Sequence, residues 1–463
     1  MSSPSSEAPI RNAAEAAAYL EGLIDREKRP DFDYKRIDLG PIRQLIRRLD
    51  HPERDLPALH IAGSKGKGST ALFAEAVLRA AGRRVGTFTS PHLESWTERF
   101  RIDGREVEGS KLASAIDRIR PHADALRLGD AALVPSFFDV TTAAALVLFR
   151  EASVDFAILE TGLGGRLDST NVCVPAVTCV TSIELEHTDK LGSRLGEIAA
   201  EKAGILKHGV PAVVGPLPPE ARAVVVERAL EVGAPVVELG RSFRFELLEE
   251  SLDGLRLRLE DEALDVEVRV PVMGAHQAVN AALAVACVRR ALGAEASLSS
   301  AVTRGLAAAK LPGRVEVLQR DPTLIVDSAH TAVSAQSLAA SLSRLPRRRT
   351  RLVLSISAGK DLASILEALL PVATEVTVTR AEPARSLAPG EIAAAIRAVA
   401  PGVPVNVIPN PHLAVRTARD GLGPGDCLCA TGSVYLAGIA RRVLRDRSPL
   451  DRSRISRRSH AEP

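Results

Sequence analysis

The sequence predicts an α/β protein of two domains, and three of its properties lead to this prediction. Its 463 residues exceed what a single hydrophobic core usually supports. Hydrophobic residues make up 46% of the chain and charged residues 25%, a balance typical of globular proteins. Short apolar runs alternate with segments of helical periodicity, as in a parallel sheet covered on both faces by helices.

The first stretch of this alternation extends over residues 57–240. Its apolar runs are ALHIAG, RVGTFTS, DFAILE, AVTCVTSI and PAVVG, and helical patterns separate them. Over residues 241–270 polar and apolar residues alternate instead, which predicts a small β-meander. Together with a helix expected over residues 274–293, these elements predict a first domain at residues 1–297.

The alternation starts again near residue 298 with the runs TLIVDSAH, RLVLSIS, EVTVTR, VPVNVIP and DCLCATGS, each followed by a helical pattern. These runs predict a second, smaller α/β domain at residues 298–446. Residues 1–12 and the basic, Arg/Ser-rich tail at residues 447–463 are expected to be disordered.

Composition argues against several classes of function. The tail carries five arginines against Asp451 and Glu462, so it accounts for the whole formal charge of +3. The rest of the chain is near neutral and only 3% of residues are aromatic, which argues against nucleic-acid binding. No apolar run approaches the ~20 residues of a membrane-spanning helix, and the N-terminus lacks a secretory signal pattern.

The five cysteines show no paired spacing of the kind that binds metals. They are Cys173, Cys179, Cys287, Cys427 and Cys429. An odd number of unpaired thiols indicates reduced cysteines, and therefore a cytoplasmic protein.

A glycine-rich loop, GSKGKGST at Gly63–Thr70, separates an apolar run from a helical pattern. In this context glycines let backbone N–H groups approach an anion, the helix N-terminus attracts negative charge, and a lysine reaches the terminal phosphates. The spacing differs from that of the common phosphate loop, and a turn that only packs a strand on a helix is the alternative. The strand–loop–helix context favours phosphate binding.

Polar residues at the ends of neighbouring runs predict a cation site. Glu160 ends an apolar run, and a carboxylate beside a phosphate loop is a natural Mg²⁺ ligand, although alone it could be a cap or a surface acid. His187 follows the next apolar run, where a histidine is either structural or a ligand. The glycine-rich segment 162–165 between them predicts a mobile loop from which Arg166 and Asp168 could contact a substrate.

Lys202 lies in a helical pattern, beside Glu201 and on a mostly apolar face. Such a lysine usually keeps its ammonium group in solvent. Partial burial would instead lower its pKa below the free value of ~10.4 and leave a reactive neutral amine.

These motifs together resemble the folylpolyglutamate synthase/dihydrofolate synthase family of the Mur ligase superfamily. The matching strings follow the family's order over nearly the whole chain: IDLG (37–40), GSKGKGST, TSPHL (89–93), SFFD (136–139), LETGLGGRLDSTN, TSIELEHTDKLG, EKAGI, HQAVNAA, LPGR (311–314), DSAH (327–330) and ATGSVYL. One such string would be weak evidence, whereas this many in one order identify the family.

The resemblance implies a Mur-ligase-like ATPase domain followed by a smaller Rossmann-like domain. It also implies an ATP-dependent ligase that joins L-glutamate to dihydropteroate, to reduced folates, or to both. In such enzymes ATP phosphorylates the acceptor carboxylate, and the amine of glutamate attacks the acyl phosphate to form an amide. Catalytic residues come from both domains, so the active site is expected in the cleft between them, with nucleotide binding drawing the domains together.

The resemblance assigns a nucleotide site, a metal site and a modified lysine. The nucleotide site consists of Gly66, Lys67, Gly68, Ser69, Asn280, Arg314 and Asp327. Ser90, Glu160 and His187 would bind Mg²⁺. Lys202 matches a lysine that CO₂ carbamylates, which would turn an ammonium into an anion facing the metal.

Other positions match the acceptor and glutamate sites. His330 and Ser433 resemble second-domain positions near the acyl phosphate and glutamate. The pterin-acid pocket of the bacterial enzymes is matched by Asp38, Leu39, Gly40, Ser136, Asp168 and Ser169. Taken alone, Ser90 belongs to a Ser-Pro turn, Asn280 is a capping or solvated helix residue, and Arg314 is an exposed hinge residue.

Two departures from the family pattern concern fine geometry. The chain has Ser328–Thr331 where the family usually has GAHN, so the hydroxyl of Thr331 replaces an amide. It has Ser64-Lys65 where the family usually has Thr-Asn, which adds a positive charge beside the phosphates. Lys65 is interpreted as a tolerated substitution, with a catalytic role as the alternative.

Two other functions are weighed. A Mur-type ligase acting on a cell-wall precursor or another acid is disfavoured by the SFFD and TSPHL strings, which belong to the folate branch. A uridine-nucleotide site would also need a further N-terminal domain, and about 55 residues before the loop are too few for one. A nucleotide-binding protein without ligase activity would not need the phosphate-loop, metal and second-domain residues together. The pterin-pocket matches favour a bifunctional bacterial-type enzyme, and a monomer without nucleic-acid or membrane partners is expected.

Overall fold

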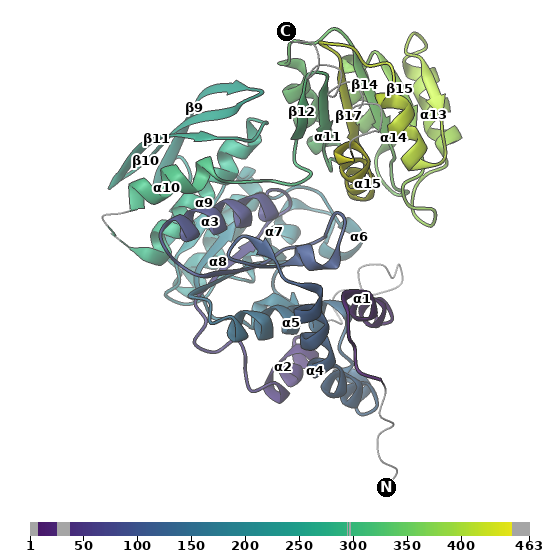
Figure 1. Ribbon diagram of the computed structural model, residues 1–463. Helices are drawn as coiled ribbons and strands as arrows, with labels where there is room; N and C mark the ends of the chain where they lie inside the picture. The colour runs from purple at the N-terminus through teal and green to yellow at the C-terminus, as the bar shows by residue number, and fades with distance from the viewer. Residues whose placement is uncertain (1–7, 26–37, 294, 296–297, 447–463) are drawn as a thin grey trace, which may run out of the picture. The chain divides into compact units, whose positions relative to one another are not determined.

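The computed structural model describes residues 8–25, 38–293, 295 and 298–446, which form two compact units (Figure 1). The first unit extends to Leu248 and includes 256–270 and 277–310, and the second combines 249–255 and 271–276 with the chain from Leu311 onward. No helix among these described residues is long and apolar enough to cross a membrane.

The predicted boundary after residue 297 differs from this division. Helix α10 (Leu298–Ala307) packs on helix α3 and strand β11 of the first unit. The contact is close because Gly305 has no side chain: a Cβ there would lie 2.6 Å from the Cα of Val77. Helix α10 therefore belongs with the phosphate-loop helix rather than with the second domain.

The predicted disorder at the N-terminus is contradicted for residues 8–12. Ile10 is buried, and its N–H donates to Asp117 at 3.0 Å. The side chain of Asn12 caps helix α1. Residues 1–7 and the predicted basic tail at 447–463 lie outside the described residues.

The first unit is built on an eight-stranded sheet in the order β4-β3-β2-β5-β1-β6-β7-β8. Its strands are β1 (Ala58–Ala62), β2 (Val85–Phe88), β3 (Phe100–Ile102), β4 (Arg105–Glu106), β5 (Phe156–Glu160), β6 (Pro175–Val180), β7 (Ala212–Val214) and β8 (Val236–Glu238). All pairs from β2 to β8 are parallel, and only β3 and β4 at one edge pair antiparallel. The five predicted apolar runs form β1, β2, β5, β6 and β7.

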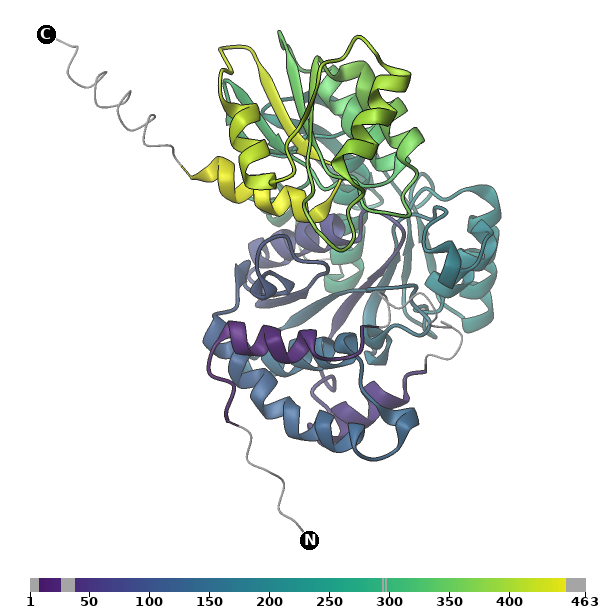
Figure 2. The same ribbon diagram turned by 90° about the vertical axis from the view of Figure 1, so that its right-hand side faces the viewer.

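Helices cover both faces of this sheet, and Figures 1 and 2 show α3 and α5 on opposite faces. The helices are α1 (Ala13–Glu21), α2 (Gly40–Arg48), α3 (Lys67–Ala80), α4 (Gly109–Arg127), α5 (Phe137–Glu151), α6 (Thr188–Leu191), α7 (Leu195–Ala203), α8 (Pro219–Val232), α9 (His276–Leu292) and α10, with 3₁₀ turns η2 (Trp96–Arg99), η3 (Ala131–Leu133) and η4 (Ser169–Val172). Right-handed crossovers in opposite directions, β1 to β2 and β2 back to β5, require helices on opposite faces.

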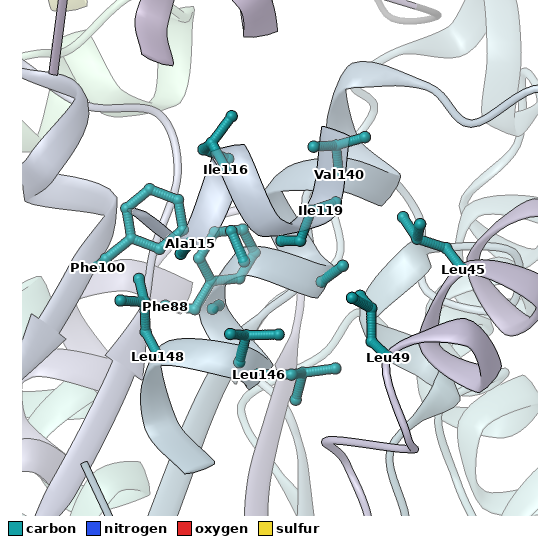
Figure 3. Close-up of a cluster of buried hydrophobic side chains, with 14 of the residues drawn as sticks. Leu45, Leu49, Phe88, Phe100, Ala115, Ile116, Ile119, Val140, Leu146 and Leu148 are labelled. Atoms are coloured by element: carbon teal, nitrogen blue, oxygen red, sulfur yellow. The ribbon is translucent and has the colours of Figure 1, made fainter. Parts of the chain in front are cut away.

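Side chains from α2, α4, α5 and β2 fill one core beneath the sheet (Figure 3). Leu45, Phe88, Ile116 and Leu146 are among its members, and each is almost fully buried. A second cluster lies between β6, β7 and helices α7 and α8. The predicted meander is a separate three-stranded sheet in the order β11-β10-β9, formed by β9 (Phe243–Ser251), β10 (Gly254–Asp261) and β11 (Leu264–Val270).

The second unit contains a six-stranded sheet in the order β12-β13-β17-β14-β15-β16. Its elements are β12 (Glu316–Arg320), β13 (Thr323–Val326), β14 (Thr350–Leu354), β15 (Glu375–Val378), β16 (Val405–Val407) and β17 (Cys427–Thr431), with α11 (Ala332–Ser343), α12 (Leu362–Leu369), η5 (Leu370–Val372), α13 (Pro389–Val399), α14 (Pro411–Arg419) and α15 (Val434–Arg445). Only β12 runs antiparallel.

The second sheet is covered on both faces, as a Rossmann-like domain requires. Alternate residues of β14 enter different cores: Leu352 and Leu354 pack with α11, α12 and α13, whereas Val353 packs with α14 and α15. This alternation follows from the two-residue repeat of a strand. The predicted α/β class and the five predicted strands of this domain are confirmed.

A buried histidine in β1 generates a prediction about acid stability. Burial, with a smaller effect of Lys207, lowers the pKa of His60 to about 3, and its Nε2 lies 2.8 Å from the hydroxyl of Thr170. The unfolded chain binds a proton near pH 6.5 that the folded chain excludes, so the free energy of unfolding should fall by up to ~1.4 kcal/mol per pH unit between about pH 6 and pH 4.

Urea unfolding of His60→Asn should show a flatter pH dependence over this range than the parent protein. The exposed His412 provides the control, because His412→Asn should retain the parent slope. An equally steep dependence in His60→Asn would show that another group binds the proton.

Candidate active site

The carboxyl ends of β1, β5 and β6 lie side by side in the middle of the first sheet. Strand β1 continues through α3 to β2, β5 is inserted between β1 and β2, and β6 lies on the other side of β1. Ligands of parallel α/β sheets bind where the strand order changes direction in this way. The glycine-rich loop after β1 therefore begins at a typical binding position.

Neighbouring side chains pack so closely against the loop that only glycine fits at two of its positions. A Cβ on Gly63 would overlap the hydroxyl of Thr181 at 1.9 Å, and one on Gly66 would lie 2.2 Å from Oδ1 of Asn280. The same Thr181 hydroxyl donates to the carbonyl of Lys65 at 2.6 Å, and the N–H of Ser64 donates to the Ser182 carbonyl at 2.8 Å. Thr181 and Ser182 thus fix the path of the loop.

The loop leads into the first turn of α3. Gly66 is the N-cap residue of this helix and has a left-handed backbone conformation, with φ of 85°. The Nζ of Lys67 donates to the carbonyl of Gly63 at 2.8 Å and so lies across the loop. Ser69 follows in the first turn and is buried. Backbone N–H groups of a first helical turn have no partner within the helix, so this end can bind phosphate oxygens.

The structure also brings the predicted nucleotide residue Asn280 to this loop. It lies in α9, far along the chain, and its Nδ2 donates to Gln277 at 2.9 Å. This bond turns Oδ1 toward Gly66, which explains why a side chain at Gly66 is excluded.

Two of the three predicted metal ligands are in contact. Glu160, at the end of β5 and 4% exposed, accepts a hydrogen bond from the N–H of Ser90 at 3.0 Å. Its carboxylate also approaches the loop, because a Cβ on Gly68 would lie 3.3 Å from Oε2. His187 follows β6 at the start of α6, with φ of 48°, and its role as a third ligand stays a prediction.

These residues fit a magnesium ion. A carboxylate and a serine hydroxyl are oxygen donors of the kind Mg²⁺ prefers, and the ion usually completes its shell with water and substrate phosphates. Gly68 keeps the space between the carboxylate of Glu160 and the phosphate loop free of side chain. Among the described residues no cluster of three or more His, Cys, Asp or Glu forms a metal site, so a metal here depends on this mixed set.

Lys202 is a buried lysine, contrary to the usual solvated position. It is 2% exposed, and its Nζ donates to the carbonyl of Gly63 at 2.9 Å and to Oε1 of Glu186 at 3.1 Å. Burial, then the nearby charge of Lys67, lowers the pKa of Lys202 to about 8 although Glu186 opposes the shift. The predicted depression of this pKa is therefore present.

Glu186 is a residue that the sequence interpretation missed. Burial alone would raise its pKa, but the surrounding lysines, led by Lys202, hold the pKa at about 2. Its other oxygen accepts from the Nζ of Lys65 at 3.1 Å. The available signal was its position immediately before His187 in TSIELEHTDKLG.

The predicted pterin-acid residues fall into three groups. Ser136 caps α5 and donates to Asp139 at 2.6 Å, while Ser169 donates to the other oxygen of Asp139 at 2.7 Å. Asp139, which the interpretation did not single out, therefore joins the two serines. Asp38 precedes α2 and is exposed, its side chain accepts the N–H of Gly40, and Leu39 is buried.

Asp168 is turned inward instead of toward solvent. Its carboxylate is buried and accepts the N–H groups of Gly162 at 2.9 Å, Leu163 at 3.0 Å and Thr170 at 3.0 Å. Burial raises the pKa of Asp168, and these hydrogen bonds oppose the shift. The observed contacts shape the glycine-rich segment, and direct contact with an acceptor stays a prediction. Arg166 pairs with Glu201 at 2.8 Å.

In the second unit, two predicted nucleotide residues belong to loops that are bonded to each other. The buried carboxylate of Asp327 accepts the N–H of Val315 at 2.8 Å and that of Ala329 at 2.7 Å. Val315 has φ of 44°, which a β-branched residue rarely adopts, and it directly follows Arg314. Asp327 therefore positions the backbone that carries Arg314.

The departure in this unit, at Ser328–Thr331, has a structural explanation. The hydroxyl of Ser328 donates to the carbonyl of Gly313 at 2.9 Å, which adds another bond between the same loops. Thr331 is the N-cap of α11 and forms a capping box with Ser334. Threonine and asparagine both cap helices well, so the loss of the amide leaves the helix start intact.

His330 and Ser433 lie where the strand order of the second sheet changes direction. Strand β17 is inserted between β13 and β14, and the N–H of Gly432 donates to the Ala329 carbonyl at 2.9 Å. Ser433 caps α15, and Nδ1 of His330 lies 2.8 Å from the carbonyl of Ser328. The starts of α11 and α15 are therefore adjacent, and both attract anions.

His276 is a second residue that the interpretation missed, although it lies in the HQAVNAA string. It is grouped with the second unit, where the charges of Asp327, Glu250 and Arg314 act on it. Burial lowers the pKa of His276, although the charges of Asp327 and Glu250 oppose the shift.

Comparison with known proteins assigns these features to one family. The Mur ligase middle domain matches residues 136–288, and the glutamate ligase domain of Mur ligases matches residues 313–434. The dihydrofolate synthase/folylpolyglutamate synthase of Bacillus subtilis (strain 168) is 36% identical over 343 residues, which cover 72% of this chain and 79% of the relative.

Solved structures agree with this assignment. A Mycobacterium tuberculosis folylpolyglutamate synthase complexed with ADP and AMPPCP matches with a TM-score of 0.84 and 33% identity, covering 95% of this chain and 100% of that chain. A bifunctional folylpolyglutamate synthase/dihydrofolate synthase from Yersinia pestis, complexed with AMPPNP and a Mn ion, matches with a TM-score of 0.80 and 30% identity, covering 96% and 100%. The chain therefore belongs to the folylpolyglutamate synthase/dihydrofolate synthase family of Mur ligases.

Proposed function

We propose that this protein is a bifunctional, ADP-forming ligase that adds L-glutamate to dihydropteroate and to reduced folates through an acyl phosphate. The observation that carries the proposal is the phosphate loop at the end of β1, where Asn280 contacts Gly66 and Glu160 approaches Gly68. Forming an amide from a carboxylate is unfavourable in water, and ATP supplies the activation. The protein has to position the reactants and neutralise charge.

The loop residues would hold the nucleotide phosphates. Backbone N–H groups of Gly66, Gly68 and Ser69 surround the start of α3, and Lys67 lies across the loop with its ammonium on the Gly63 carbonyl. Moving that ammonium onto the terminal phosphates would exchange a neutral acceptor for a charged one, which strengthens the hydrogen bond. Ser90, Glu160 and His187 would hold Mg²⁺, which neutralises phosphate charge when bound.

Lys202 is the residue we assign to carbamylation. Its amine is buried, and its pKa of about 8 leaves part of it neutral at physiological pH. A neutral lone pair can attack CO₂, which forms the N–C bond and releases a proton. The resulting carbamate would add an anion near the metal ligands.

The second unit would bind the amino acid and help to position the nucleotide. The adjacent starts of α11 and α15, with His330 and Ser433, suit a carboxylate of L-glutamate. Arg314 and Asp327 would contact the nucleotide from their bonded loops. The acceptor's pterin acid would lie near Ser136, Ser169 and the start of α2.

A cytoplasmic monomer is the setting we propose. All five cysteines are free and buried, which suits a reducing compartment. The proposed substrates are small molecules, and the reaction needs no nucleic acid or membrane.

Phosphate release tests the proposed function. The purified protein would be mixed with ATP, Mg²⁺ and L-glutamate, and dihydropteroate or tetrahydrofolate would be added in separate reactions. Turnover with both acceptors is expected. Turnover with one names the single acceptor, and turnover with neither would contradict ligase activity on these acids while leaving the family assignment intact.

Glu160→Gln should reduce acceptor-dependent turnover by at least about 100-fold, because it removes the charge of the only predicted carboxylate ligand while keeping its size. The Mg²⁺ concentration for half-maximal turnover should rise in parallel. Glu227→Gln, on the exposed side of α8, should leave both quantities unchanged. Unchanged Mg²⁺ dependence in Glu160→Gln would remove Glu160 from the metal site.

The pKa of Lys202 generates a further expectation. At fixed dissolved CO₂, the initial rate of carbamylation should rise about tenfold per pH unit up to pH 8 and then level off, because only the neutral amine reacts. Incorporation of ¹³CO₂, followed by NMR, measures this rate. Lys202→Arg should show no incorporation, and a rate that keeps rising about tenfold per pH unit from pH 8 to about pH 10 would contradict the depressed pKa.

A further inference from the structure

One carboxylate joins two lysines beside the phosphate loop. Glu186 accepts from Nζ of Lys202 through Oε1 and from Nζ of Lys65 through Oε2, each at 3.1 Å. Lys202 is 2% exposed, Glu186 11% and Lys65 28%, so the bridge is largely removed from water.

The backbone of Lys65 is held on both sides of its Cα. Its N–H donates to the hydroxyl of Ser182 at 2.8 Å, and its carbonyl accepts from the hydroxyls of Thr181 at 2.6 Å and Ser182 at 3.2 Å. The side chain therefore starts from a fixed point above β6. From there its ammonium donates to Oε2 of Glu186, the oxygen that Lys202 does not contact.

Carbamylation of Lys202 would reverse the charge balance at this bridge. Before the reaction, two ammonium groups flank one carboxylate. The amine attacks CO₂, the new N–C bond forms, one C–O π pair moves to oxygen, and a proton leaves to solvent. Two anions, the carbamate and Glu186, would then lie together in a poorly hydrated place, where like charges repel strongly.

Lys65 is the cation that would stay bonded to Glu186. We propose that Lys65 is a positioning residue that stabilises the carbamate of Lys202 by holding Glu186, and thereby lets the modified lysine persist at lower CO₂. Lys67 contributes positive charge nearby, but it lies on the Gly63 carbonyl and is assigned to the nucleotide phosphates. The inference rests on the proposed modification of Lys202, and it gives the substitution at Lys65 a function instead of treating it as neutral.

The carbamate itself provides the test, independently of turnover. The full chain would be titrated with ¹³C-bicarbonate at constant pH, and the carbamate resonance would be integrated by ¹³C NMR. Lys65→Asn, the residue usual in the family, should need at least tenfold more bicarbonate for half-maximal signal. Lys65→Arg keeps the charge and should stay within about threefold of the parent protein.

Lys111→Asn, at an exposed position of α4, removes the same charge elsewhere and should behave like the parent protein. Thermal unfolding of each variant checks that the fold is retained, and Lys65→Met gives a second neutral variant if Lys65→Asn unfolds. Equal bicarbonate dependence in the parent protein and the folded neutral variant would overturn the proposal, as would a parent protein that shows no resonance.

The same samples separate this inference from the proposed function. A carbamate resonance that depends on Lys65, in a protein that turns over neither acceptor, would support the proposed role of Lys65 and contradict the ligase assignment. Full turnover with both acceptors and no carbamate resonance would support the ligase and contradict the role of Lys65.

Discussion

The close approach of side chains to the backbone of the phosphate loop is the constraint on which the first unit depends. Thr181 directly follows β6 on one side of β1, Glu160 ends β5 on the other, and Asn280 comes from the distant helix α9. Thr181 lies against Gly63, Glu160 against Gly68 and Asn280 against Gly66, each within contact distance of the Cβ that another residue would carry there. The loop can take this path only because Gly63 and Gly66 carry no Cβ, which would lie 1.9 Å from Thr181 and 2.2 Å from Asn280. The strand order β5-β1-β6 brings Glu160 and Thr181 to the loop.

The charges of the site follow from that packing. The loop carries the half-buried Lys65 and Lys67, and α7 adds the buried Lys202, so three ammonium groups lie close together at the loop. Such a cluster is costly unless anions offset it. Glu186 supplies one anion in the protein, and phosphates and a carbamate would supply the others during the reaction. Burial, and then the repulsion of Lys67, lowers the pKa of Lys202 and makes its amine available to CO₂.

In the second unit, side chains also hold the backbone of a neighbouring loop, although that loop is not a glycine-rich phosphate loop. Asp327 and Ser328, directly after β13, hold the backbone of Gly313 and Val315, so two loops behave as one rigid element. The strained φ of Val315 is maintained by this bonding. In both units a side chain that follows a parallel strand satisfies backbone groups of a neighbouring loop, and the residues available for chemistry project from the loops held in this way.

The sequence by itself determined the α/β class, the strands and the phosphate loop, because apolar periodicity and glycine positions are local properties of the chain. It also indicated that Glu160 and Lys202 stand at special positions. Only the tertiary structure decided that α10 packs on α3 through Gly305 and that Glu186 joins Lys65 to Lys202. These outcomes depend on which distant elements become neighbours, and on the burial and charge that follow from strand order and helix packing, so no local pattern encodes them.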